Sequence, residues 1–149
     1  MTSKDFPDCF HRTVVKGLFV RDGKILLVKE APDLADKWEL PGGGLGFGED
    51  PHAGLVREIK EEMNLEVTSV SKQPTYVWMN KFEGCRGMDW YYSVVLAYTI
   101  DLANLDFVPT KECVAIQLFS PDDLTDLGDE LYHQSCTLRE IFNPADFKN

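Results

Sequence analysis

Three acidic residues on one short segment, Glu58, Glu61 and Glu62, are the side chains of this sequence most directly suited to chemistry. At positions i, i+3 and i+4 of an α-helix, side chains project along neighbouring lines on one face. Like charges placed this way repel by roughly 0.2–0.5 kcal/mol per pair. The spacing therefore favours either a solvated helix face or a bound cation. A hard divalent ion such as Mg²⁺ takes oxygen ligands and bridges to substrate phosphates.

The acidic segment belongs to a longer pattern of fixed spacing. Gly43 is followed after five residues by Glu49, and after seven more by Arg57, which begins the run REIKEEMNL. This resembles the signature of the Nudix hydrolases, G-x5-E-x7-R-E-U-x-E-E-x-G-U, where U is a bulky aliphatic residue. One specified position differs, because Asn64 replaces the last glycine. Asn is the non-glycine residue that best tolerates a left-handed backbone, so a helix C-cap is still expected there.

The resemblance extends beyond this motif and implies a ligand set. The preceding segment WELPGG is similar to the family's usual lead-in, and a looser likeness spans about residues 13–124. It implies that Glu58, Glu61 and Glu62 bind Mg²⁺, with the backbone carbonyl of Gly42 or Gly43 completing the inner shell. Carboxylates, a carbonyl and water suit Mg²⁺, for which Mn²⁺ can substitute, and would suit zinc poorly.

Two further roles follow from the resemblance. Glu49 and Arg57 are expected to form a bidentate ion pair that clamps the glycine-rich loop to the helix. The family commonly adds a glutamate from a later loop as a ligand or general base. Glu112 is the candidate here, with Asp89 and Glu83 as alternatives. Which glutamate is the base stays open, so the catalytic candidates are Glu61 and Glu112.

Substrate contacts are expected from the glycine-rich loop and from one lysine. Dense glycine before a metal-binding helix suits close approach of backbone N–H groups to a diphosphate, and Gly43 and Gly44 are the candidates. Lys29, at the end of an expected strand, matches a position that is often basic and contacts phosphate in related proteins. A solvated lysine is the alternative.

Length and composition are those of one domain, residues 1–149. No run of 18 apolar residues and no secretory h-region occur, which favours a cytoplasmic protein that does not contact membrane. The four widely spaced cysteines are expected to be reduced thiols.

Charge argues against long nucleic acid as a partner. The formal net charge is −10, and residues 101–149 carry ten acidic and three basic residues. No basic stripe is available to follow a phosphate backbone. A small, nucleotide-sized phosphorylated substrate remains compatible, because bound metal ions reverse the local field. The oligomeric state is left open.

The expected elements alternate between strands and two main helices. Residues 13–20 and 25–29 predict a hairpin through Asp22-Gly23. Asp50 and Pro51 predict the start of a helix whose apolar stripe contains Leu55, Val56, Ile59 and Met63. Further strands are expected at 66–70, 76–79, 91–99 and 114–119, a hairpin loop near the site at 81–89, and helices after Ser120 and over 130–142. This order predicts an α/β fold, a Nudix-type α/β/α sandwich around a mixed β-sheet.

Function follows from the same residues. The favoured hypothesis is an Mg²⁺-dependent hydrolase that cleaves the diphosphate bond of a nucleoside diphosphate linked to another group, or of a nucleoside triphosphate. A ligand sensor or scaffold without turnover is one alternative. An isoprenyl diphosphate isomerase is another, because such enzymes share the fold and use a cysteine, for which only Cys85 is a candidate. Which diphosphate or triphosphate is the substrate is left open.

Overall fold

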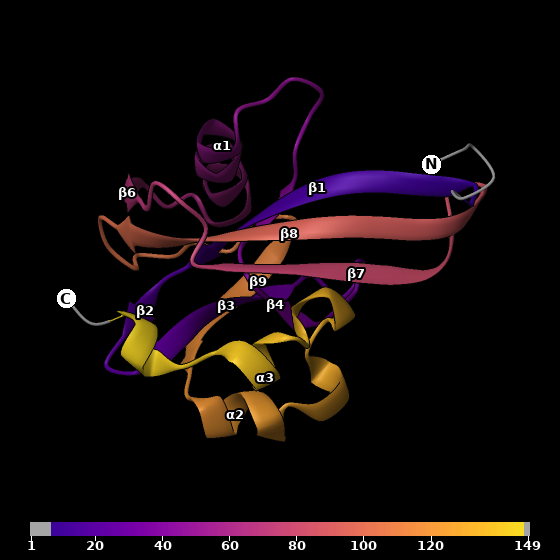
Figure 1. Cartoon of the computed structure of the whole chain (residues 1–149). Coiled ribbons are helices and arrows are strands. Elements are labelled where there is room, and N and C mark those ends of the chain that lie inside the picture. Colours follow the sequence, from indigo (N-terminus) through magenta and orange to yellow (C-terminus); the bar gives the residue numbers. More distant parts are fainter. Residues whose placement is uncertain (1–6, 148–149) are drawn as a thin grey trace.

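The computed structural model describes residues 7–147 and contains three layers (Figure 1). Helix α1 covers one side of the β-structure, and short helices from the C-terminal third cover the other. The strands are β1 (Cys9–Leu18), β2 (Val20–Arg21), β3 (Lys24–Glu30), β4 (Trp38–Glu39), β5 (Gly42–Gly44), β6 (Val67–Val70), β7 (Tyr76–Cys85), β8 (Met88–Leu102) and β9 (Cys113–Phe119). The expected α/β fold is confirmed.

The strands divide into two sheets rather than one. The first has the order β5-β1-β8-β6, with β7 also paired to β8, and the second has the order β2-β3-β4, with β9 paired to β3. β1 and β8 are parallel, whereas β5 and β7 are antiparallel to their neighbours, so the first sheet is mixed. The chain passes from the first sheet to the second between β1 and β2, and the expected hairpin then joins β2 to β3, where Asp22 and Gly23 have φ of 53° and 76°. Two consecutive positive φ values match a right-twisted hairpin.

Helix α1 (Pro51–Met63) has the caps that the sequence predicts. The Asp50 side chain accepts a hydrogen bond from the Ala53 N–H at 3.0 Å, and Asn64 is left-handed with φ of 55°. Leu55 and Ile59 are fully buried against the first sheet. Val56 was wrongly placed in this apolar stripe, because it lies at the stripe's margin and is 41% exposed.

The hairpin expected at 81–89 is present, but its strands continue through most of this segment as the end of a long ribbon. β7 and β8 continue to a two-residue turn, Arg86-Gly87, with φ of 51° and 79°. Phe82 and Tyr91 stack across these strands with ring centroids 4.5 Å apart, a contact that favours continued pairing. β1, β8 and β7 therefore extend side by side beyond the rest of the core (Figure 1).

The single helix expected over 130–142 is also wrong, because that segment bonds to the sheets. The Tyr132 N–H donates to the Trp38 carbonyl at 2.8 Å, and the Gln134 carbonyl accepts from the Trp78 indole at 2.9 Å. These bonds use backbone groups that a helix would need. The observed elements are α2 (Pro121–Asp126), η2 (Gly128–Glu130), η3 (His133–Ser135), α3 (Leu138–Ile141) and η4 (Pro144–Phe147).

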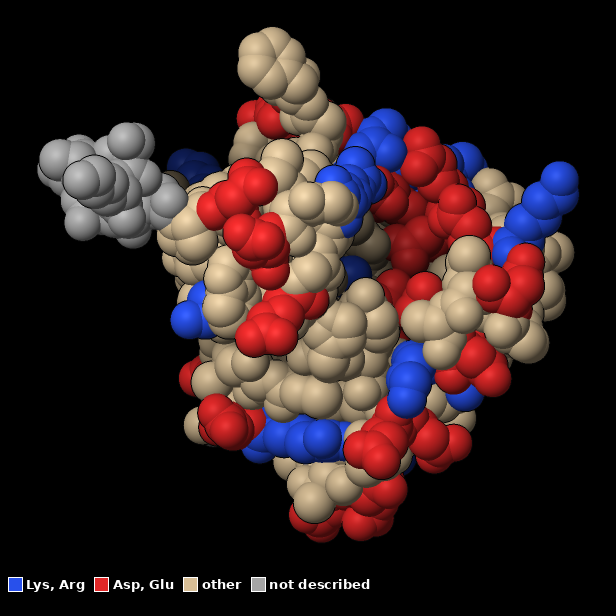
Figure 2. Space-filling view, turned by 90° about the vertical axis from the view of Figure 1, so that its right-hand side faces the viewer, with Lys and Arg blue, Asp and Glu red and all other residues tan. Residues whose placement is uncertain are grey.

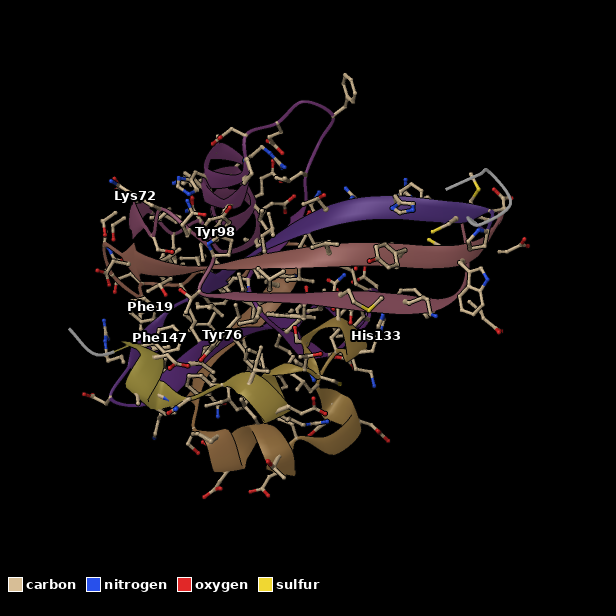
Figure 3. The ribbon with its side chains drawn as sticks, viewed as in Figure 1. Phe19, Lys72, Tyr76, Tyr98, His133 and Phe147 are labelled. Carbon is tan, nitrogen blue, oxygen red and sulfur yellow. The ribbon has the colours of Figure 1, made fainter. Side chains whose placement is uncertain are left out.

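The C-terminal turn is held against the start of β7. The Tyr76 hydroxyl donates to Asp146, and its ring packs edge-on against Phe147 at 5.8 Å between centroids (Figure 3). Burial, with Asp146 beside it, raises the pKa of Tyr76 to about 12. No helix within residues 7–147 is both long and apolar enough to cross a membrane.

The left-handed cap at Asn64 leads to a stability prediction. Asn64→Gly should be neutral or stabilising, because glycine adopts positive φ without strain. Asn64→Val should lower the free energy of unfolding by about 1 kcal/mol or more, since a β-branched residue is strained there. Urea denaturation of both variants measures the difference, and equal midpoints would contradict the assigned cap.

Candidate active site

The glycines of β5 allow the strand to lie very close to its neighbours. Gly42 has φ of 129°, and a Cβ built on it would lie 2.1 Å from the Val15 carbonyl oxygen. A Cβ on Gly43 would lie 2.7 Å from the Glu58 carboxyl group. Any side chain at these two positions would therefore separate β5 from β1 or from α1. Glycine here brings backbone N–H and carbonyl groups against the acidic face of the helix.

Glu62 is the buried member of the acidic set. Its side chain reaches β5, where Oε1 accepts the Gly42 N–H at 2.7 Å, and the residue is only 5% exposed. Burial raises the pKa of Glu62 to about 8. The Cys113 thiol lies 3.8 Å from Glu62 Oε2, and burial together with this carboxyl raises the pKa of that thiol.

A buried lysine, which sequence reasoning missed, completes the inner side of the site. Lys16 is 2% exposed, and its Nζ donates to the carbonyls of Leu40 at 3.0 Å and Gly42 at 3.3 Å. Glu39 Oε2 lies 3.8 Å from the same nitrogen. The only sequence signal was a charged residue inside the apolar run TVVKGLFV, at an inward position of the strand.

Carboxyl groups outnumber ammonium groups in this interior. Burial raises the pKa of Glu30 to about 7 and also raises that of Glu39, while Lys16 opposes both shifts. Glu30 Oε1 is buried and has no hydrogen-bond partner among the described residues. Lys16 therefore supplies one positive charge for several buried carboxyl groups. An added cation would favour the ionised form of these carboxyl groups.

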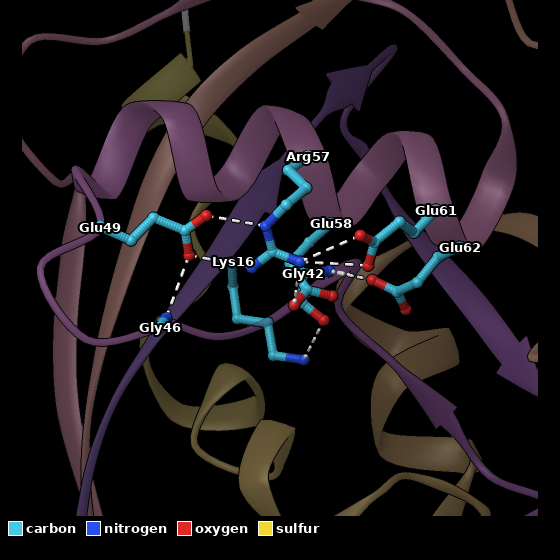
Figure 4. A network of polar contacts seen from close by, with 8 residues as sticks. All are labelled: Lys16, Gly42, Gly46, Glu49, Arg57, Glu58, Glu61 and Glu62. Carbon is cyan, nitrogen blue, oxygen red and sulfur yellow. Dashed lines mark hydrogen bonds and ion pairs between the residues drawn. The ribbon is translucent and has the colours of Figure 1, made fainter.

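Arg57 gathers the acidic groups on the outer side (Figure 4). Its Nε and Nη2 bond to the two oxygens of Glu49 at 2.7 and 2.9 Å, and Glu49 also accepts the Gly46 N–H at 3.0 Å. Nη1 lies 3.2 Å from Glu58 and 3.1 Å from Glu61. The hydrogen bonds from Arg57 lower the pKa of Glu49 to about 2. The loop and helix are thus joined by one guanidinium. Figure 2 shows acidic side chains around a hollow, with basic side chains beside it.

These residues suit a hard divalent cation. Within residues 7–147 no three carboxylate, imidazole or thiolate groups already converge as a complete metal site. The Arg57 Nη1 group nevertheless lies between Glu58 and Glu61, where two carboxylates already face one positive charge. Glu62 and the β5 backbone are adjacent. The donors are all oxygen, which fits Mg²⁺ or Mn²⁺.

The other candidate residues from the sequence analysis lie in different parts of the fold. Glu112 lies in the loop before β9, and the Thr110 hydroxyl of that loop donates to the Glu62 carbonyl at 2.9 Å, so the loop packs against the end of α1. Lys29 lies 3.8 Å from Asp36 and 5.8 Å from the centre of the Trp38 ring. Glu83 is on the outer half of the ribbon, opposite Trp90. The third acidic candidate, Asp89, also lies near the ribbon tip.

A family model described as NUDIX domain matches residues 10–139. The chain therefore belongs to the NUDIX domain family. This agrees with the glycine strand, the capped helix and the acidic cluster described above.

Individual relatives match shorter or more distant stretches. A protein named putative 8-oxo-dGTP diphosphatase 2 from Mycobacterium tuberculosis is 41% identical over 63 residues, which cover 41% of this chain and 45% of that protein. The aligned region thus spans less than half of that relative. A MutT-like protein from Streptomyces ambofaciens is 29% identical over 82% of this chain and 72% of its own length.

Solved structures share the fold. The E. coli ORF135 protein superposes with a TM-score of 0.63 at 25% identity, covering 87% of this chain and 86% of that one. A MutT NUDIX hydrolase from Burkholderia pseudomallei has a TM-score of 0.63 at 24% identity, with 90% and 99% coverage.

The raised pKa of Glu62 leads to a pH prediction. Between its ordinary pKa of 4.5 and the folded value of about 8, the folded protein retains a proton that the unfolded chain releases. Stability in EDTA should therefore fall as pH rises from 5 to 8, and Glu62→Gln should reduce that fall by on the order of 2 kcal/mol.

Urea denaturation at the two pH values measures this effect. Glu61→Gln is the matched control, because the Glu61 side chain is 51% exposed, and it should keep the wild-type pH dependence. An unchanged slope in Glu62→Gln would show that Glu62 is not the group responsible.

Proposed function

We propose that this protein is a divalent-metal-dependent hydrolase of a small nucleotide-like diphosphate compound, with Mg²⁺ or Mn²⁺ held by Glu58, Glu61, Glu62 and the Gly42 carbonyl. The observation that carries the proposal is the packing of two carboxylates, Glu58 and Glu62, against a strand made only of glycine, with Glu61 on the same helical turn bonded to Arg57. Such a site offers oxygen ligands on one side and open backbone on the other. Both suit a diphosphate.

The side chains of the site have different roles in the proposed reaction. A bound metal ion would neutralise phosphate charge and lower the pKa of water. Glu49 and Arg57 fix the loop to the helix, so that the carboxylates keep their spacing. Glu61, exposed at the outer edge, or Glu112, from the neighbouring loop, takes the proton of the attacking water. In-line attack at phosphorus then releases a phosphorylated product.

The β5 backbone and Lys29 contribute substrate contacts in this proposal. Gly43 and Gly44 have no side chains and β5 is an edge strand of the first sheet, so phosphate oxygens could approach its outer backbone edge. Lys29 would serve a phosphate if it left its 3.8 Å contact with Asp36. The buried ammonium group of Lys16 already donates to two backbone carbonyls. In this proposal it positions the β5 backbone and does not contact the substrate.

The names of relatives support a phosphorylated, mostly nucleotide-sized substrate. Besides the diphosphatase mentioned above, a CTP pyrophosphohydrolase from E. coli is 42% identical over 57 residues. An RNA pyrophosphohydrolase from Acidiphilium cryptum is 44% identical over 57 residues. These segments cover 37% and 36% of this chain, so substrate choice must be argued from its own residues.

The two alternatives have less support in the structure. A sensor without turnover has no need for three mutually repelling carboxylates on one helical turn. An isomerase would need a cysteine at the site, but Cys85 pairs with Met88 at the tip of the ribbon. Full activity of Cys85→Ser on a diphosphate would exclude a catalytic role for that thiol.

The metal cluster leads to an activity prediction. Glu61→Gln and Glu62→Gln each remove one negative charge at nearly constant shape and should lower kcat at least ~100-fold. Both variants should remain folded, because loss of like-charge repulsion on the helix is neutral or mildly stabilising. Phosphate release with Mg²⁺ and with Mn²⁺ measures the effect, and full activity in EDTA would refute the metal mechanism.

Substrate size gives a second prediction. Binding to a long polyanion requires several Lys or Arg contacts, and this chain has a net charge of −10. A mononucleotide-sized diphosphate compound should therefore be hydrolysed with a higher kcat/KM than 5′-triphosphorylated or capped RNA. A coupled-phosphatase screen over nucleotide sugars, dinucleoside polyphosphates, nucleoside triphosphates and a short RNA measures this. RNA as the preferred substrate would overturn the prediction.

A further inference from the structure

The ribbon has an open edge along strand β7. Within residues 7–147, β7 pairs with β8 alone, so the N–H and carbonyl groups of its other edge have no strand partner. Its inner half contacts the C-terminal turns, because the Trp78 and Asn80 side chains donate to the Gln134 carbonyl. The segment from Lys81 to Cys85 lies farther out along the ribbon (Figure 1). A long open edge of this kind is a template for another strand.

The outward face of this edge strand carries apolar side chains followed by two opposite charges. Val77 and Met79 are 58% and 46% exposed, and Lys81 and Glu83 on the same face are also exposed. Lys81 Nζ lies 5.3 Å from the centre of the Trp90 ring. Within residues 7–147, neither Lys81 nor Glu83 has an opposite charge within 4.0 Å. Both charges are therefore available to a second strand.

The outer half of the ribbon is electrically neutral, although the whole chain has a formal net charge of −10. Its segments, residues 7–12 and 80–92, contain equal numbers of basic and acidic side chains, namely Arg12, Lys81 and Arg86 against Asp8, Glu83 and Asp89. Two copies of so acidic a chain repel each other through their net charge. At the ribbon they can meet without net repulsion between the surfaces in contact. The same segments are rich in aromatic side chains, which are enriched in the cores of protein interfaces.

The order of the two charges makes the edge complementary to itself. If two copies of β7 pair antiparallel about a twofold axis at Phe82, Lys81 of each copy lies opposite Glu83 of the other. An axis at Lys81 or at Glu83 would bring like charges together, and an axis at Asn80 would place both charges opposite apolar side chains. Opposite charges that face each other across an antiparallel pair are stabilising, whereas like charges are destabilising. Charge complementarity therefore selects the axis at Phe82.

This register also gives the neighbouring side chains suitable partners. The two Phe82 rings lie side by side at the axis, on the face where each already stacks on Tyr91 at 4.5 Å between centroids. Cross-strand aromatic pairs stabilise a sheet. The exposed Met79 side chain lies opposite Cys85 of the second copy, and so gains an apolar neighbour.

We propose that this protein forms a homodimer in which the β7 edges of two copies pair antiparallel about a twofold axis at Phe82, with two ion pairs between Lys81 and Glu83. A second copy supplies the complementary order of charges by symmetry, which favours it over an unrelated strand as the occupant of this edge. An isologous contact is closed, so it produces a dimer and not a fibre. The inference does not rest on the proposed function, because no residue of the acidic cluster takes part.

Charge reversal tests the register. Lys81→Glu places two acidic side chains opposite each other at both contacts, and Glu83→Lys does the same with two lysines. Each variant alone should raise the dissociation constant of the dimer at least about 10-fold. An equimolar mixture of the two variants restores both ion pairs in a heterodimer, and should associate like the wild type.

Sedimentation velocity over a dilution series from about 100 µM protein measures these constants, because a strand pair alone is small beside a typical stable interface. The wild type and the mixture should approach twice the 16.9 kDa mass of one chain. Lys72→Glu is the matched control. It makes the same charge change at an exposed lysine between β6 and β7, away from the ribbon tip (Figure 3), and should dimerise like the wild type.

Three outcomes would overturn the proposal. They are a monomeric wild type at about 100 µM, a dimer that neither charge reversal weakens, and a mixture of the two variants that stays monomeric. Circular dichroism checks that each variant is folded. The double variant with both reversals, which restores the two ion pairs in a homodimer, should associate like the wild type and replaces the mixture if one single variant is unfolded.

Discussion

The structure depends on how the backbone of Gly42 is held between two buried polar side chains, Glu62 and Lys16. Its N–H donates to Glu62 of α1, and its carbonyl accepts from Lys16 of β1. Each polar side chain is buried and would be costly without its hydrogen-bond partner, so the strand, the helix and the lysine are mutually required. This contact fixes β5 at the helix, where Gly43 lies against Glu58. Arg57 then joins Glu58 to Glu61 on the outer side.

Arg57 and Lys16 divide the charge balance of the site between two environments. Arg57 acts at the half-exposed outer edge, where bonding to Glu49 and Glu61 also raises its own pKa. Lys16 acts in the interior, where burial raises the pKa of Glu62 and of Glu39. Water screens the outer pairs, so they adjust easily, whereas the inner group is fixed by packing. The inner contacts of the acidic cluster, around Lys16, are therefore rigid, whereas the outer contacts, around Arg57, can adjust.

Local signals in the sequence predicted the elements that they control. Asp50 and Asn64 are caps that act on their own helix, and the Asp22-Gly23 turn acts on its own hairpin, so these features could be read directly. The segment at 130–142 could not, because its backbone bonds to Trp38 and Trp78, which are distant in sequence. The long ribbon was missed for a similar reason, since it depends on cross-strand pairing.

The candidate site was likewise predictable only where its residues lie close together in the sequence. Glu58, Glu61 and Glu62 share one helix, so their common face followed from spacing, and Glu49 followed from its place in the motif. Lys16 enters the site from β1 through pairing with β5, which no local pattern encodes. The ribbon that carries Arg12, Phe10 and Phe82 extends beyond the main core, and these side chains are only partly buried. Substitutions there alter little core volume, so the ribbon can vary in sequence with little loss of stability while the buried contacts of α1 are left intact.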